Sequence, residues 1–226
     1  MKPMNILAAA LLGAAALPAS AAQFDFYKLG NGGGDFLASN GQACTGGDWC
    51  SSNVGGNVFN GNLSFSDGGI TAVATGTYNA TAAAVMQDHQ NGWTATSGAG
   101  LGVYHKRDNS DDNITTGEKL TITFDQVVKL NSIDLRSDGH NFTAWAANST
   151  FLFNNVSTSL PLGVGSIAVN QTGQVFTFEF GGRIPDQFYL AAMTATAVPE
   201  PESYALMLAG LGAIGLVVGR RTRRQG

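Results

Sequence analysis

The sequence is poor in charge, in cysteine and in histidine, and each shortage excludes a class of protein. Only 12% of the 226 residues are charged, which excludes a coiled coil and an acidic disordered chain. Lys and Arg number 12 against 16 Asp and Glu, so the chain has no basic surplus with which to bind nucleic acid. The 2 cysteines cannot build a disulfide scaffold or a four-ligand zinc site unaided. The 30 glycines follow no Gly-X-Y period and therefore indicate turns.

The N-terminal segment 1–21 has the three parts of a secretory signal peptide. Lys2 supplies the positive charge and residues 6–17 form the apolar run. Ala19 and Ala21 then form an Ala-x-Ala cleavage site. A buried helix at the start of a domain is the alternative, but the run is rich in alanine and has no polar face. We expect export through the Sec translocon and cleavage by signal peptidase.

The C-terminal segment 198–226 joins a proline-rich tripeptide, an apolar stretch and a basic end. The tripeptide is Pro199, Glu200 and Pro201, and its prolines keep it extended and accessible. Residues 203–219 carry no charge, and as a helix they would extend about 25 Å, near the lower limit for crossing a bilayer. The basic end consists of Arg220, Arg221, Arg223 and Arg224. These arginines should stay in the cytoplasm and leave the body of the chain outside.

This order of parts closely resembles the PEP-CTERM sorting signal of Gram-negative bacteria, a tail also labelled the ice-binding protein C-terminal domain. The resemblance covers about the last thirty residues of the chain. It implies that an exosortase, a membrane cysteine protease-transpeptidase, recognises the Pro-Glu-Pro segment and removes the tail. It also implies an exported protein that is anchored in the inner membrane before processing and then reaches the cell surface or the extracellular space. A plain tail anchor with a fortuitous Pro-Glu-Pro is the alternative.

The body, residues 22–197, reads as an all-β domain. Residues 119–125 alternate cleanly between apolar and polar, and residues 174–180 do the same. Shorter runs of the same kind are separated by turn residues such as Asp67-Gly68-Gly69. The exception is the stretch 81–88, which could form a short helix. We predict an antiparallel, jelly-roll-like β-sandwich, because sheets that alternate in this way need a second sheet over their apolar face.

Two cysteines, Cys44 and Cys50, lie six positions apart in a Gly-rich loop region. In an oxidising compartment the simplest interpretation is a disulfide that pins this loop. A redox pair is the sharper alternative, but no helix signal follows Cys50, as a redox motif would require. A metal half-site is a second alternative, but no histidine lies close enough in sequence to complete the set of ligands.

An acidic, amide-rich loop precedes the strand at 119–125. Its carboxylates, with the glutamate that follows, are the candidate ligands for a weak structural Ca²⁺: Asp108, Asp111, Asp112 and Glu118. Their spacing does not match an EF-hand, because glycine is missing at the required distance from a bidentate glutamate. A solvated loop between two strands is the simpler interpretation. The loop and its flanking strands also look like the body pattern of many PEP-CTERM proteins, for which no activity carries over.

No residue pattern in the body predicts an enzyme. The histidines, His89, His105 and His140, are not accompanied by a Gly-x-Ser-x-Gly nucleophile motif. The first hypothesis is therefore a structural or adhesive surface protein, in keeping with the exopolysaccharide and biofilm context of the PEP-CTERM family.

Three alternatives stay open at this point. A carbohydrate-binding module, dependent on Ca²⁺ or not, would use aromatic residues such as Trp93 and Trp145 to stack on sugars, although core packing is their commoner role. A glycoside hydrolase would need two carboxylates paired in space, which sequence spacing does not reveal. An ice-binding protein would need a regular Thr-x-Thr array, and the chain offers only isolated pairs such as Thr121 with Thr123.

Overall fold

The computed structural model of the chain describes residues 20–27, 49–51, 62–88, 99–104, 113–137, 145–161, 165–182, 186–199, 205, 207–215 and 220. Residues 20–198 form one compact unit, and the segment from Pro199 onward belongs to a second unit together with residues 1–19. The two are described separately below.

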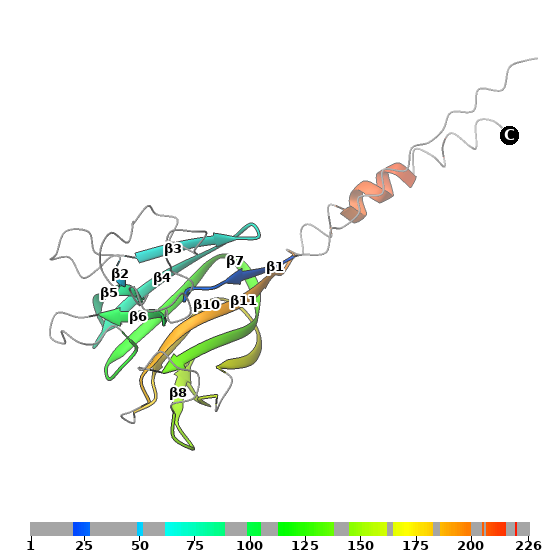
Figure 1. The fold of residues 1–226 in the computed structure, drawn as a ribbon. Coiled ribbons are helices and arrows are strands. Elements are labelled where there is room, and N and C mark those ends of the chain that lie inside the picture. The colour runs from blue at the N-terminus through cyan, green and yellow to red at the C-terminus, as the bar shows by residue number, and fades with distance from the viewer. Residues whose placement is uncertain are drawn as a thin grey trace, which may run out of the picture. The chain divides into compact units, whose positions relative to one another are not determined.

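The described residues of the body form a single antiparallel sheet of 11 strands (Figure 1). They are β1 (Ala21–Phe24), β2 (Trp49–Ser51), β3 (Asn62–Asp67), β4 (Ile70–Tyr78), β5 (Thr81–Asp88), β6 (Gly100–Tyr104), β7 (Glu118–Ser137), β8 (Thr150–Phe153), β9 (Val156–Ser159), β10 (Ser166–Phe180) and β11 (Phe188–Ala197). The all-β prediction is confirmed.

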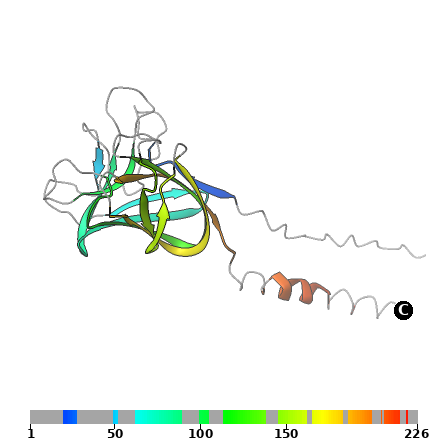
Figure 2. The same ribbon diagram turned by 90° about the horizontal axis from the view of Figure 1, so that it is seen from below.

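The sheet closes on itself instead of stacking against a second sheet. Strand β11 pairs with β6 on one edge and with β7 on the other, so that β11, β6, β5, β4 and β7 form a closed five-strand barrel. The predicted two-layer sandwich is corrected accordingly. The physical reason is strand length. Strands β7, of 20 residues, and β10, of 15, are long enough to bend and to continue from one side of the barrel to the other, so the chain does not need two separate sheets. Figure 2 shows the yellow strand β10 curving strongly around the interior.

Strand β7 makes this closure possible by changing partners halfway along one edge. Its first part, up to Phe124, pairs with β4, and its second part, from Val128, pairs with β11. Strand β10 follows the other edge with two register shifts, between Ala168 and Gln171 and between Gly173 and Val175. Such shifts bend a strand and increase its twist. The sequence indicated only the two ends of β7, as separate strands.

Phenylalanine rings fill the interior. Alternation predicts that six side chains of β7 and β10 point inward, and five of them are buried: Leu120, Ile122, Phe124, Phe176 and Phe178. The sixth, Phe180, is only half-buried. Rings from segments far apart in the sequence meet edge to face, with centroids 4.8 Å apart for Phe26 and Phe65 and 5.3 Å apart for Phe151 and Phe188. Each fully buried ring contributes about 2 kcal/mol of hydrophobic free energy. This aromatic core holds the two halves of the sheet together.

The stretch predicted as a short helix is strand β5. Its alanines favour a helix locally, but β5 is paired with β4 and then β2 along one edge and with β6 along the other. Ala83, Ala84, Val85 and Met86 are all buried. Tertiary pairing therefore overrides the local preference.

The tail unit contains a helix at residues 207–215, with Ala205 and Arg220 also helical. It lies within the predicted apolar span 203–219. Among the residues that the structure describes, no helix is both long enough and apolar enough to span a membrane.

Candidate functional site

The folded body ends abruptly where the sorting tripeptide begins. Strand β11 ends at Ala197, and the backbone N–H of Val198 still donates to the carbonyl oxygen of Val127, at 3.0 Å. The next residue, Pro199, has no N–H to donate and is exposed. Every sheet hydrogen bond of β11 is therefore made before the tripeptide starts. Glu200 and Pro201 lie outside the described residues.

The N-terminal strand lies beside this end. Ala21 pairs with Thr196 and Phe24 with Met193, and Ala22 is fully buried. Ala21 is thus part of β1, whereas Ala19 lies outside the described residues. The signal peptide and its cleavage site stay a prediction, because nothing in the described structure tests them.

The described helix of the tail has a fully apolar surface. Its large side chains are exposed by 36% to 65% of their area: Met207, Leu208, Leu211 and Ile214. Apolar area exposed in this way is unfavourable in water, by about 25 cal/mol for each Å². Of the predicted topology residues, Arg220 is helical and exposed. Arg221, Arg223 and Arg224 lie outside the described residues.

The predicted disulfide and calcium site fall mostly outside the described residues. Cys44 is outside them, and of Cys50 the structure describes only the backbone, which pairs with Gln87 as part of β2. Asp108, Asp111 and Asp112 are also outside. The disulfide and the calcium site therefore remain predictions.

Glu118, the fourth predicted calcium ligand, is hydrogen-bonded within the protein. Its side chain is only 2% exposed and shares the buried face of β7 with Leu120. Its Oε2 atom accepts a hydrogen bond from the backbone N–H of Thr115, at 3.0 Å. Within the described ranges, no group of three or more His, Cys, Asp and Glu side chains is placed to hold a metal ion. The geometry assigns Glu118 to holding the loop before β7.

Trp145, a predicted sugar-stacking candidate, belongs to the core. It is 4% exposed, and its indole N–H donates to the carbonyl oxygen of Gln187 at 3.1 Å. A buried ring cannot stack on a polysaccharide, so this role is excluded for Trp145. Trp93 lies outside the described residues.

A buried arginine ties the segment after β1 to the sheet. The guanidinium carbon of Arg136 lies 4.3 Å from the ring centroid of Tyr27, which is a cation–π distance. Burial lowers the pKa of Arg136, and the nearby Tyr27 and Asp134 act in the opposite direction. The N–H of Tyr27 also donates to the carbonyl oxygen of Ala191, at 3.1 Å. These contacts hold the segment in place.

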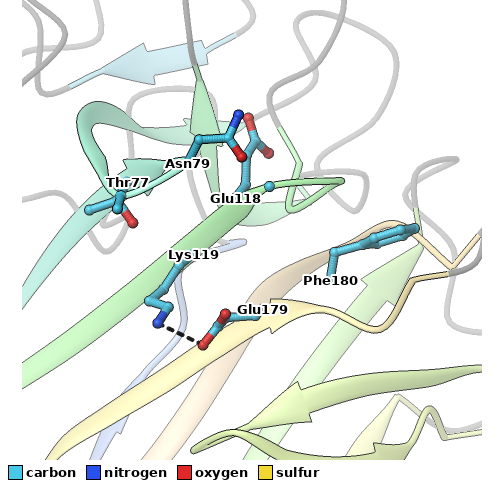
Figure 3. A pocket seen from close by; sticks show the side chains of 8 residues that line it. Thr77, Asn79, Glu118, Lys119, Glu179 and Phe180 are labelled. Atoms are coloured by element: carbon cyan, nitrogen blue, oxygen red, sulfur yellow. Dashed lines mark ion pairs between the residues drawn. The ribbon is translucent and has the colours of Figure 1, made fainter.

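One pocket, of about 480 Å³, opens where β4, β7 and β10 meet (Figure 3). Its volume lies within the range of ordinary small-molecule sites, roughly 300–1,000 Å³. Eight residues line it: Thr77, Asn79, Ala80, Gly117, Glu118, Lys119, Glu179 and Phe180. In Figure 3 Lys119 and Glu179 point toward each other on one side of the opening, Asn79 and Glu118 lie together on another, and Phe180 stands apart from both. The sequence analysis did not identify this site.

A cross-strand row of polar side chains forms the pocket's outer wall. Lys119 pairs with Thr77 of β4 on one edge and with Glu179 of β10 on the other. The ammonium Nζ of Lys119 lies 2.9 Å from Oε1 of Glu179, and the two side chains are 36% and 22% exposed. A half-exposed ion pair of this kind contributes only about 0–1 kcal/mol to stability. The pair is therefore available to bind a ligand at little cost to the fold.

The turn between β4 and β5 forms the pocket's rim. Asn79 and Ala80 have φ values of 47° and 64°, the left-handed conformation that a two-residue hairpin turn requires. Asn tolerates this conformation, whereas Ala there is strained by about 1–2 kcal/mol. Gly117, with φ 83°, lies against the turn, and a Cβ at this position would be 2.7 Å from Oδ1 of Asn79. The strained turn and the close glycine together shape the opening.

Residues 197–224 match the family model described as the PEP-CTERM protein-sorting motif. No curated protein and no solved structure matches the chain. The match begins at the last residue of β11, so it coincides with the boundary at which the folded body ends.

Proposed function

We propose that this PEP-CTERM sorting-signal protein is a structural or adhesive component of the cell surface or of the exopolysaccharide matrix, and that it is not an enzyme. The motif match supports an exported protein that is sorted by an exosortase. The observation that carries the proposal is the end of the sheet at Val198, directly before Pro199. A body that is complete before its sorting signal starts can be released intact.

The mechanism of sorting follows from the chemistry of the tail. A protease needs an extended backbone that is free of sheet pairing, and Pro199 is exposed and cannot donate to a sheet. A proline at 201 disfavours a helical backbone at the residue before it, so the sequence predicts an extended tripeptide. Arginines at the end of the tail favour retention of that end in the cytoplasm. The exosortase would then cut near the tripeptide and leave β11 with all of its partners.

The arrangement of carboxylates supports a non-enzymatic role. Glu118 and Glu179 both line the pocket, as two hydrolytic carboxylates would. However, Glu118 is on the buried face of β7 and is engaged by the N–H of Thr115, whereas Glu179 pairs with Lys119 on the outer face. Each carboxylate is thus already engaged by a group of the protein, which supports a structural role for both.

The test is the mature C-terminus. Intact-mass spectrometry of membrane and extracellular fractions should find a chain that ends near residues 198–202 outside the membrane. Replacement of Pro199, Glu200 and Pro201 by alanine should leave a full-length, membrane-bound chain. The matched control is Glu202→Ala, which removes a neighbouring charge and keeps the tripeptide.

Unchanged release of the triple variant would refute recognition through the tripeptide. A wild-type chain that keeps its tail in the membrane would instead identify a plain tail anchor. Release of reducing ends from polysaccharides by the purified protein would contradict the non-enzymatic role.

A further inference from the structure

The pocket at the end of β4, β7 and β10 lies outside residues 197–224, which match the sorting motif. It joins a cation, carboxylates, an amide and an aromatic ring around one opening of about 480 Å³. The ion pair in it adds little stability, as described above, and the adjacent turn holds Ala80 in a strained conformation. Strain of this kind concentrates at functional sites. These features are typical of a ligand-binding site.

The donors and acceptors suit a sugar. Lys119 offers ammonium protons and Glu179 offers carboxylate oxygens at a fixed separation of 2.9 Å, so neighbouring hydroxyls of one ring can bond to both. The amide of Asn79 adds a donor and an acceptor at the rim, where the residue is exposed. Phe180 adds apolar surface for the C–H groups of the ring. Hydroxyls and C–H groups on one small ring are the defining chemistry of a saccharide.

The sheet continues this polar surface beyond the pocket. Thr75 pairs with Thr121, and Thr121 pairs with Thr177, in the row next to Lys119 and Glu179. Alternation along each strand places these threonines on the same outer face as the ion pair. Thr75 is exposed and Thr121 is half-buried, whereas the hydroxyl of Thr177 is buried. A chain of sugars would therefore extend from the pocket along β4 and β7.

The charge of the pocket selects among sugars. The ammonium of Lys119 is already paired with the carboxylate of Glu179, at 2.9 Å. An acidic sugar would have to separate this pair to reach Lys119 and would be repelled by Glu179, whereas a neutral sugar can bond to both groups.

We infer that this pocket binds a neutral hexose residue of a polysaccharide, with Lys119 and Glu179 as its principal ligands. The site is independent of the sorting signal, and it would let the released body attach to a neutral glycan matrix.

Binding is measured by the retardation of the full chain in native gels that contain dextran, galactomannan or xyloglucan, with alginate as the acidic comparison. The protein is kept in a detergent without a sugar headgroup. We expect retardation by at least one neutral polysaccharide and none by alginate. Lys119→Gln and Glu179→Gln should each weaken binding about tenfold, the effect of removing one hydrogen bond to a charged group.

The matched control is Lys129→Gln, an exposed lysine on the same strand but outside the pocket. It should bind like the wild type, and all three variants should unfold at the wild-type urea midpoint. Absence of retardation by every neutral polysaccharide would overturn the inference. Equal weakening by the control variant, or tighter binding to alginate, would also overturn it. None of these results depends on tail processing, so the two proposals can fail separately.

Discussion

Closure of the sheet through β6 and β11 can be tested at Gly100. This residue has φ 127°, and a Cβ there would lie 2.4 Å from the carbonyl oxygen of Leu190 and 2.7 Å from Cα of Ala191. Both neighbours are backbone atoms of β11, so they cannot move aside as a flexible side chain would. Gly100→Ala must therefore separate β6 from β11 or retain the clash.

The size of the effect follows from a comparison with Gly69. Gly69 has φ 78° with nothing within 4 Å of an added Cβ, so Gly69→Ala meets only the backbone penalty, about 1–2 kcal/mol. Gly100→Ala adds overpacking against a fixed strand, which brings its cost to about 3–5 kcal/mol. Both substitutions change the unfolded chain in the same way, so the difference reports the native state at Gly100, where the φ of 127° and the close approach of β6 to β11 both oppose a Cβ.

The assay is urea unfolding of the two variants and the wild type. With a slope of about 2 kcal/mol per molar urea, the midpoint of Gly100→Ala should lie about 1 M below that of Gly69→Ala. Equal midpoints would refute the reasoning, because they would mean that β6 does not lie against β11. The barrel would then be open at this edge.

Two further predictions concern the pocket and the acidic loop. Ala80→Gly should raise the free energy of unfolding by about 0.5–1 kcal/mol, because relief of the left-handed strain exceeds the added entropy of the unfolded chain. A loss of stability in a urea titration would contradict the strained turn. Removal of Ca²⁺ with EDTA should leave the midpoint of thermal unfolding unchanged, because the Glu118 carboxylate is buried and hydrogen-bonded to the backbone of Thr115. A midpoint that falls with EDTA and is restored by added Ca²⁺ would identify the acidic loop as a metal site.

Local patterns in the sequence predicted those features of this protein that depend only on neighbouring residues. Alternation over 119–125 and 174–180 predicted which side chains face the core, because the period of a strand is a property of the backbone. The tripeptide, the apolar span and the arginines at the C-terminus likewise form a signal that is read in linear order. The family match at residues 197–224 agrees with that reading.

Tertiary structure decided what depends on distant partners. The alanines of residues 81–88 favour a helix by themselves, and only pairing on both edges makes them β5. Closure of the barrel required that β7 exchange β4 for β11 along one edge, and no local pattern encodes such an exchange. The pocket is the clearest case, because Lys119 and Glu179 are 60 positions apart in the sequence and meet only through the register of β7 with β10. Strand register is a global property, set by the packing of the whole core, and sequence alternation determines only which face a residue occupies.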